Sequence, residues 1–408
     1  MQHWQRNLYT IWVAELIAIS GFSVVQPFIP YYIQHLGVTD LAEVELYSGL
    51  SISVHALSMA IFAPLWGALA DRVGRKLMVV RAMFGGGLLF AAMIFVRDIP
   101  SLLALRALQG CLTGTVAAAT TLVACSAPRE KAGYALGTLQ VAIYMGALVG
   151  PMLGGLVSDA WGYDAAFLVT GVLLILAGFM VLFLVEERFE PVSAKAGDGG
   201  FLNSLRLVLM LPALLPVLAV RVVLRLGDRT PGPILPLFVQ SLLPVGAKVA
   251  SVAGLVIGAG AAASAAGAVV LGRASDRIGH RRTLLMCAFG TAVFYVPQVF
   301  VTDTVQLLLC QVAVGFMLGG TLTSVSALLA TLAPPGRQGV VYGLDSSAVS
   351  VANSLGPMLG AGIAVLFGMR PIFLFAAGVY LLGALAVARL VPESAHGRGP
   401  VVPPGPLE

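Results

Sequence analysis

Long apolar runs separated by short polar loops dominate the chain, and their pattern predicts membrane-spanning helices. Each run holds about 20 mainly apolar residues, the length that a helix needs to cross a bilayer. The runs are continuous and do not alternate between apolar and polar residues as barrel strands do. Twelve can be marked, near residues 8–33, 46–70, 77–97, 101–125, 133–157, 164–185, 213–240, 249–272, 283–301, 305–330, 339–366 and 371–391. The pattern predicts an all-α membrane protein with twelve transmembrane helices.

The longest polar stretch lies between the sixth and seventh runs and divides the chain into two halves. We predict an N-terminal six-helix bundle over residues 1–190, a cytoplasmic linker over 191–207 and a C-terminal six-helix bundle over 208–395. The tail, residues 396–408, is rich in proline and glycine, which predicts disorder.

Sequence landmarks recur in the same order in both halves. QPFIP around Pro27 matches GPILP around Pro233, and LVGPMLGG around Pro151 matches SLGPMLGA around Pro357, both at an offset of 206 residues. Because the repeated unit contains an even number of spans, its two copies have the same orientation. The repeat predicts two parallel bundles related by an axis along the membrane normal.

The composition excludes a soluble enzyme. Hydrophobic residues make up 58% of the chain and charged residues 11%, whereas a soluble domain carries roughly 25% charged residues. The five histidines and four cysteines show no metal-ligand spacing, and no phosphate-binding loop is present. We expect no enzymatic activity, no metal and no cofactor. The net charge of +5 does not indicate nucleic-acid binding, because no basic soluble segment carries interleaved aromatic residues.

The basic residues predict the orientation in the membrane. Seventeen lie on the side of the two termini and three in the opposite loops. Since cytoplasmic loops retain Lys and Arg, both termini are expected in the cytoplasm, and the protein in the cytoplasmic (inner) membrane.

The loop between the second and third runs reads GALADRVGRK. Asp71 ends one span, and Gly74 permits a tight reversal before the next span begins. An acid at this place can pair with an arginine or face a helix N-terminus of the other half, and so hold the cytoplasmic side closed. The predicted gating residues are Gly67, Asp71, Arg72, Gly74, Arg75 and Lys76, with a degenerate copy at Asp276 and Arg277.

The fifth run contains GALVGPMLGG. Gly146, Gly150 and Gly154 recur every four residues, a spacing that allows a neighbouring helix to approach closely. Pro151 kinks the helix, and Gly155 completes the motif.

These motifs resemble those of the major facilitator superfamily, and in particular of its 12-span drug:proton antiporters. The loop is similar to the signature G-x-L-A-D-R-x-G-R-K, and the fifth run to the antiporter signature G-x-x-x-G-P-x-x-G-G. GFSVVQPFIP, residues 21–30, resembles a drug-antiporter signature. The resemblance implies a major facilitator fold, a gating role for the loop and export in exchange for protons. It also implies a role in proton coupling for Arg106, although an arginine that snorkels to the outer interface is an alternative.

Glu15 is a lone carboxylate in the first run, on one helix face with Ser23 and Gln26. An ionisable residue inside a membrane is a functional candidate by default, although a structural ion pair is an alternative. We interpret Glu15 as a group that takes up and releases a proton. Asp228 and Asp345 are the other carboxylate candidates for proton coupling.

The seventh run carries Arg221, Arg225, Asp228 and Arg229 on one face. Arg221 corresponds to Glu15 at the repeat offset, so we expect both to face one central cavity. The intramembrane charges sum to +1, which favours neutral, zwitterionic or anionic amphiphiles over lipophilic cations. The predicted cavity residues are Gln26, Phe28, Tyr31, Gln109, Gln140, Tyr144, Arg221, Arg225 and Phe238.

The sequence thus predicts a proton-coupled antiporter that exports small amphiphilic molecules by alternating access, of the multidrug efflux type. The alternatives are an exporter of one specific metabolite, a proton-coupled importer on the same fold, and a non-transporting sensor or scaffold. The expected partners are a small-molecule substrate, protons and the lipid bilayer, and the protein is expected to be a monomer.

Overall fold

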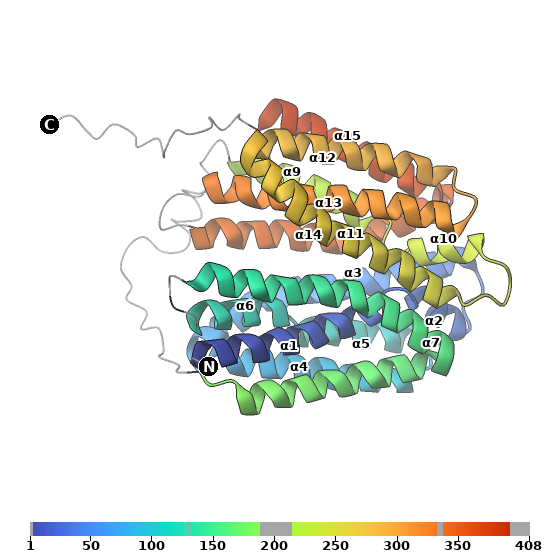
Figure 1. The fold of residues 1–408 in the computed structure, drawn as a ribbon. Coiled ribbons are helices and arrows are strands. Elements are labelled where there is room, and N and C mark those ends of the chain that lie inside the picture. Colours follow the sequence, from blue (N-terminus) through green and yellow to red (C-terminus); the bar gives the residue numbers. More distant parts are fainter. Residues whose placement is uncertain (1–2, 127, 129–130, 188–213, 333–337, 392–408) are drawn as a thin grey trace.

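The computed structural model describes residues 3–126, 128, 131–187, 214–332 and 338–391. This part of the chain is helical, and its helices run side by side along one common direction (Figure 1). The predicted linker and tail lie outside the described residues. We call the face at which α1 begins and α15 ends the termini face, and the other end of the bundle the opposite face.

The helices match the twelve apolar runs in order. Five runs form single helices: α3 (Leu41–Val73), α11 (Val249–Ile278), α13 (Thr304–Leu332), α14 (Gln338–Phe367) and α15 (Pro371–Leu390). Five are divided: α1 (His3–Val24) and α2 (Ile29–His35), α4 (Arg75–Ala92) and η1 (Met93–Phe95), α5 (Ile99–Leu112) and α6 (Thr115–Ser126), α9 (Leu214–Arg229) and α10 (Leu235–Leu242), α12 (His280–Tyr295) and η3 (Val296–Val299). The fifth and sixth runs lie in α7 (Ala132–Leu184), which turns back at Gly162.

Eight described helices are long and apolar enough to cross a bilayer. One of them spans Tyr134–Leu184 and contains two runs. Three further runs fall in helices of fewer than 18 residues, namely α5, α9 and α12. The all-α fold class predicted from the runs is confirmed.

Two kinds of break divide the spans. Between α1 and α2, and between α9 and α10, prolines interrupt the helical hydrogen bonds at positions 206 residues apart. The break between α5 and α6 contains no proline. It falls at Gly114, whose φ of 112° favours glycine. The sequence pattern predicts one continuous run over 101–125, so this break is a correction.

Side chains of neighbouring helices satisfy the carbonyls freed at Gly114. The Trp66 indole donates to the Cys111 carbonyl at 2.6 Å, and Arg81 donates to the Thr113 carbonyl at 3.4 Å. The Arg81 guanidinium also lies 3.7 Å above the Trp66 ring. Broken helices occur at membrane depth only where neighbours satisfy the backbone in this way.

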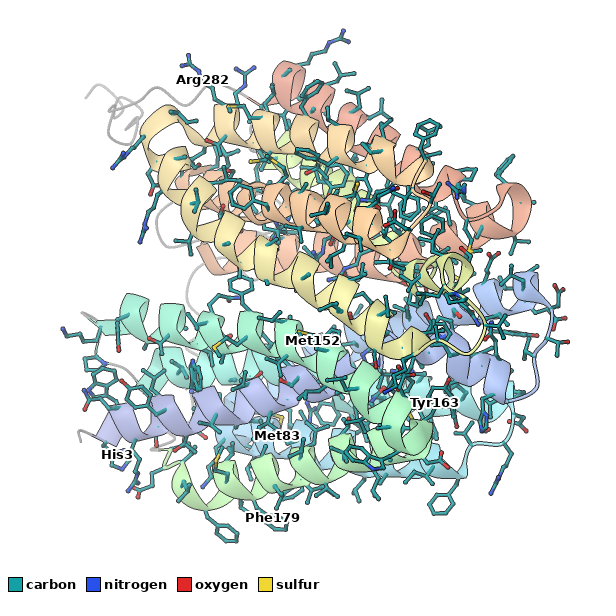
Figure 2. The ribbon with its side chains drawn as sticks, turned by 45° about the vertical axis from the view of Figure 1, so that its right-hand side comes forward. His3, Met83, Met152, Tyr163, Phe179 and Arg282 are labelled. Atoms are coloured by element: carbon teal, nitrogen blue, oxygen red, sulfur yellow. The ribbon has the colours of Figure 1, made fainter. Side chains whose placement is uncertain are left out.

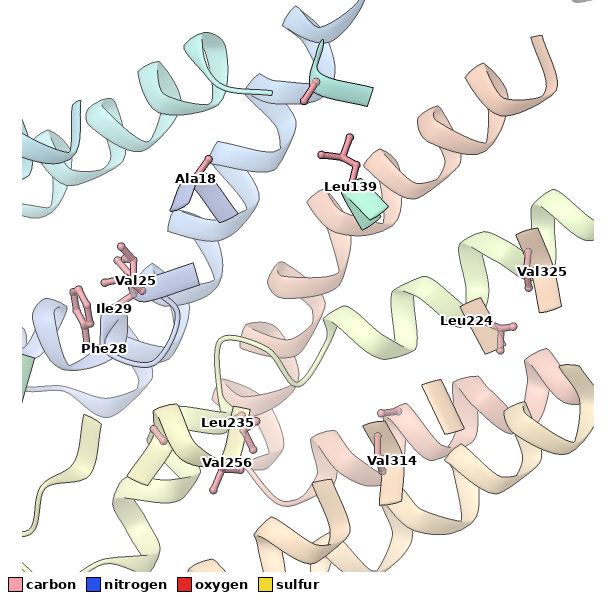
Figure 3. Close-up of a cluster of buried hydrophobic side chains, with 14 of the residues drawn as sticks. Ala18, Val25, Phe28, Ile29, Leu139, Leu224, Leu235, Val256, Val314 and Val325 are labelled. Carbon is pink, nitrogen blue, oxygen red and sulfur yellow. The ribbon is translucent and has the colours of Figure 1, made fainter. Parts of the chain in front are cut away.

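The helices pack into two halves. In the first, α1 and α4 pack on α7, and α3 packs on α5; in the second, α11 and α12 pack on α13, and α9 packs on α14 and α15. Contacts of α7 with α11 and of α3 with α14 join the halves. The buried apolar core includes residues of both halves, such as Val25 and Phe28 from the first and Leu235 and Val256 from the second (Figure 3).

Polar contacts join the halves at the opposite face. Gln34 and Gln240, equivalent in the repeat, exchange two hydrogen bonds of 3.2 Å. Tyr31 donates to the Pro236 carbonyl, and Asp159 accepts from the backbone N–H of Ser251 at 2.7 Å. From there the ribbons of the two halves diverge towards the termini face (Figure 2).

Candidate functional site

Glu15 lies midway along α1 and is 0% exposed. The Thr115 hydroxyl donates to its Oε2 at 3.3 Å, and Oε1 has no hydrogen-bond partner. Among the described residues no cation forms an ion pair with this carboxyl. A buried charge without a partner costs several kcal/mol, so this site suits a carboxyl that can be neutralised by a proton.

The partner of Glu15 stands at the start of a half-helix. Thr115 is the first residue of α6, directly after the break at Gly114. The first backbone N–H groups of a helix have no partner within it and carry a partial positive charge. The break therefore places a helix N-terminus beside the Glu15 carboxyl. The sequence reasoning missed it; glycine between two threonines in an apolar run was the available signal.

The charged residues of the seventh span bind one another within the second half. Arg221 pairs with Asp345 on α14, with Nε 3.0 Å from Oδ1. Asp228 binds Arg225 at 2.7 Å and Arg229 at 3.6 Å. The expectation that Glu15 and Arg221 face one cavity is wrong in this conformation, because Glu15 is fully enclosed and Arg221 is held by Asp345.

A small cavity lies beside these pairs. Its volume is about 10 Å³, and it is lined by Arg221, Arg225 and Asp228 on α9, with Thr321 on α13 and Tyr380 on α15. Three arginines and two aspartates leave one positive charge in excess here. The charge around this small cavity therefore favours a neutral or anionic group over a cation.

Arg106 on α5 is 8% exposed and donates to Gln109 Oε1 at 2.9 Å. Its Nε and Gln109 Nε2 have no hydrogen-bond partner, and no carboxylate of the described chain forms an ion pair with Arg106. This burial does not fit an arginine that snorkels to the interface. Arg106 precedes Thr115 by nine residues, about 13 Å along a helix axis, and is not paired with Glu15.

The glycines of the fifth run face α1. A Cβ on Gly150 would lie 2.4 Å from the Ser20 carbonyl oxygen, and one on Gly154 2.0 Å from that of Val24. A Cβ on Gly146 would lie 2.8 Å from Ile19. Close helix packing is therefore one role of this motif, as the spacing predicts.

The same helix also meets the other half. A Cβ on Gly155 would lie 2.2 Å from the Ala250 carbonyl oxygen. On the facing helix α11, a Cβ on Gly254 would lie 2.2 Å from the carbonyl oxygen of Pro151. The motif thus packs α7 against α1 on one side and against α11 on the other.

The predicted gating loop is described in part. Gly74 has φ 101° between α3 and α4, and the matching Gly279 has φ 102°. Glu187, after α7, accepts from the backbone N–H groups of Arg75 and Lys76 at 2.9 and 2.8 Å, a capping contact that sequence reasoning missed. Asp276 and Arg277 are exposed at the end of α11. The surroundings of Gly67 and the side chains of Asp71 and Arg72 lie outside the description.

The predicted cavity residues separate into two groups. Tyr144 is hydrogen-bonded to Gln140 and lies within electrostatic range of Arg221 and Arg225 across the two halves. Gln26 is exposed. The structure does not bring the other aromatic members, Phe28, Tyr31 and Phe238, to this place.

Phe28 and Phe238 are enclosed in aromatic clusters, 5.3 Å from Phe167 and 5.0 Å from Phe373 between ring centroids. Tyr31 is buried where the halves meet at the opposite face. The expectation that these three rings line a cavity is wrong for this conformation, because each fills the core or the closed contact.

Comparisons with known proteins agree with this architecture. The family model of the Major Facilitator Superfamily matches residues 11–242 and 217–406. Multidrug resistance protein MdtG of Escherichia coli (strain SMS-3-5 / SECEC) is 35% identical over 386 residues, 94% of each chain.

Two solved structures share the fold at low sequence identity. A bacterial homologue of the human lysosomal transporter Spinster, in an inward-facing and unoccupied conformation, has a TM-score of 0.77 at 14% identity, covering 96% of this chain and 98% of that one. The human organic anion transporter MFSD10 (TETRAN) has a TM-score of 0.70 at 18% identity, covering 95% and 100%.

Proposed function

The chain belongs to the Major Facilitator Superfamily, and from this we propose that it exports small amphiphilic molecules in exchange for protons. The family consists of membrane transporters and not of enzymes, so the chain is a multi-pass secondary transporter. The 35% identity to a multidrug resistance protein supports efflux, as does the resemblance of the fifth run to the antiporter signature. We further propose that it works as a monomer with both termini in the cytoplasm.

The observation that carries the proposal is the difference between Glu15 and the other two candidate carboxylates. Asp228 and Asp345 are each bound to arginine, so their negative charges are compensated within the second half. Glu15 is enclosed without any cation. Of these three candidates, Glu15 is therefore the one whose charge depends most on the conformation, which is what a proton carrier requires.

The arrangement of the halves supports alternating access as the proposed mechanism. Polar contacts hold them together at the opposite face, and the ribbons part towards the termini face. If the termini face is cytoplasmic, this is the state that receives substrate for export. Substrate and proton shift the equilibrium between states only through their different affinities for the two. Tyr144, Gln140 and Arg225 are the proposed contacts for the polar end of the substrate.

Transport into inside-out vesicles tests the proposal. A panel of fluorescent amphiphiles is offered with and without an imposed pH gradient. The wild-type protein should accumulate some of them only with the gradient, and Glu15→Gln should lose this dependence. Glu43→Gln is the matched control, because Glu43 is exposed in the first turn of α3.

Any other result of this experiment indicates a different function or a different proton carrier. Accumulation without regard to the gradient contradicts proton coupling, and gradient-driven movement out of the vesicles indicates an importer. If no compound moves while the folded protein is present, a specific metabolite transporter or a non-transporting sensor replaces the multidrug exporter. If Glu15→Gln still couples to the gradient, Glu15 is not the proton carrier.

A further inference from the structure

Glu15 is closed off in a conformation whose halves diverge towards the termini face. Its side chain is 0% exposed, so solvent does not reach it directly in this conformation. The helices α6 and α7, which pack on α1, offer no charged side chain near Glu15 as a relay, and Arg81 on α4 is engaged by the Thr113 carbonyl. α6 carries none, and α7 carries none between Ala132 and Ser158. On α7, Tyr134 is hydrogen-bonded to Tyr9. Asp159, the first charged residue along α7, lies at the opposite face. A proton that exchanges with Glu15 in this state needs another route.

A pocket opens at the termini face of the first half. Its volume of about 380 Å³ is lined by Trp4 and Asn7 on α1, Leu122 and Ser126 on α6, Glu186 and Glu187 after α7, and by His3 and Arg75. The mutual hydrogen bonds of Asn7 with the Glu186 backbone, at 2.7 and 3.1 Å, hold the pocket wall in place.

The pocket and Glu15 lie on one seam between α1 and α6. On α1, Trp4, Ile11 and Glu15 follow one another at intervals of seven and four residues, which places them on one helix face. On α6, Thr115, Leu122 and Ser126 do the same. The two faces meet at Glu15 and Thr115 by a hydrogen bond. The same two helix faces also line the pocket, so the seam runs from Glu15 to the pocket.

The closed part of the seam is short. Thr115 and Leu122 are seven residues apart on α6, about 10 Å along the helix. That length corresponds to roughly four hydrogen-bonded waters at 2.7–2.8 Å each. At the intermediate positions of the two faces, Ile11 on α1 and Ala119 on α6 are both 0% exposed, and Leu8 on α1 is 2% exposed. Ala119 is small, so water can enter this part of the seam when the side chains of Ile11 and Leu8 shift.

The mouth of the pocket carries carboxylates that attract protons. Hydrogen bonds from His3 and Arg6 hold the pKa of Glu186 below its usual range, so Glu186 is ionised at neutral pH. Glu187 accepts from the backbone of α4. Both residues line the pocket at the termini face.

We propose that protons reach and leave Glu15 through this pocket and the α1–α6 seam, while the substrate moves between the two halves. The two transported species then use separate paths on the termini side. This inference rests on the proposed role of Glu15 as proton carrier.

Filling the pocket tests the separation of the paths. Ser126→Trp places a large side chain in the pocket, which has room for it, and leaves the space between the halves unchanged. Ser126→Ala controls for the lost hydroxyl. Thr331→Trp is the matched control at the repeat offset of 205, on the exposed end of α13. Two rates are measured in vesicles: transport driven by a pH gradient, and exchange of labelled for unlabelled substrate at equal pH.

Ser126→Trp should slow gradient-driven transport about tenfold, which corresponds to an added barrier of about 1.4 kcal/mol, and should leave exchange unchanged. Both controls should behave as the wild type. An equal loss of both rates, or no loss in either, overturns the separate route. The protein can also be folded first and blocked afterwards. For this, Ser126→Cys or Thr331→Cys is introduced after Cys111, Cys125, Cys287 and Cys310 are replaced by alanine, and a bulky thiol reagent is added from the termini side.

The failure of this inference can be distinguished from that of the proposed function. If Glu15→Gln abolishes coupling and a blocked pocket does not slow it, the proton passes between the halves and only the separate route is wrong. If Glu15→Gln leaves coupling intact, the role of Glu15 is wrong, and the route to it is refuted as well.

Discussion

Replacing Gly254 by alanine should push the two halves apart at the opposite face. An ideal Cβ at this position of α11 lies 2.2 Å from the Pro151 carbonyl oxygen of α7, whereas Cβ contacts below 3.0 Å essentially never occur. The obstacle is backbone, so it cannot rotate away. Relief requires a separation of about 1 Å, and overpacking of this kind costs roughly 1–3 kcal/mol.

Because α11 and α7 belong to different halves, the strain acts on the conformational equilibrium. The strain from the added Cβ destabilises the state that is closed at the opposite face. A state in which α7 and α11 separate does not have this strain. A penalty of about 1–3 kcal/mol shifts the ratio of the two states roughly 5- to 150-fold towards opening of that face. Gradient-driven export should fall accordingly, while the fold is kept.

Two control substitutions isolate the effect. Gly362→Ala on α14 meets nothing within 4 Å, and it makes the same gain in helix propensity, about 1 kcal/mol. Gly154→Ala brings a Cβ within 2.0 Å of the Val24 carbonyl oxygen, but this contact lies within the first half. It should lower thermal stability and leave the conformational ratio unchanged.

Distances between spin labels provide the assay. Labels at His35→Cys and Ser241→Cys stand on exposed positions of the opposite face, one in each half. Gly254→Ala should add a population with longer label distances, absent in Gly154→Ala and Gly362→Ala. A distance distribution like that of Gly362→Ala, in folded Gly254→Ala protein, would refute the reasoning.

Two further predictions concern charges. Asp345→Asn leaves Arg221 without its anion and should lower the free energy of unfolding by about 3 kcal/mol. Combining Arg221→Gln with Asp345→Asn should restore most of this loss. Thermal unfolding in detergent measures both variants, and a double variant less stable than Asp345→Asn contradicts the pairing. Hydrogen bonds from His3 and Arg6 lower the pKa of Glu186 in the folded protein. The contact between α1 and the end of α7 should therefore contribute its full stability above pH 4.5, the ordinary pKa of a glutamate. This contribution should be lost as the pH falls through the lower pKa of Glu186 in the folded state. Trp4 fluorescence reports this loss, and an unchanged acid response in Glu186→Gln would show that another group causes it.

The sequence predicted best the features that depend on local pattern. Twelve spans follow from run length. The breaks near Pro27 and Pro233 fall within runs 8–33 and 213–240, which were predicted as single spans, although proline chemistry accounts for them. The break at Gly114 could not be separated from an ordinary packing glycine, because the carbonyls it frees are satisfied by Trp66 and Arg81 from distant parts of the chain.

The candidate site was predicted in its residue types but not in its partners. Glu15 stands out as a lone intramembrane acid, yet its partner Thr115 is 100 residues away and becomes available only through the break in the fourth span. Phe28 and Phe238 were assigned to a cavity because aromatic rings can line one. Whether a ring faces a cavity or the core depends on the rotation of its helix, and an all-apolar helix surface does not encode that rotation.

The pair formed by Gln34 and Gln240 bears on how such a two-part protein can arise. When two identical units associate about a two-fold axis, a residue near the axis contacts the same residue of the other unit. A lysine or glutamate there would face its own charge, whereas a carboxamide offers both a donor and an acceptor and can bind its own copy twice. The contact therefore suits an ancestor in which two identical six-helix chains associated as a dimer. Fusion of the duplicated genes could preserve it without change, while the rest of the two halves diverged in sequence.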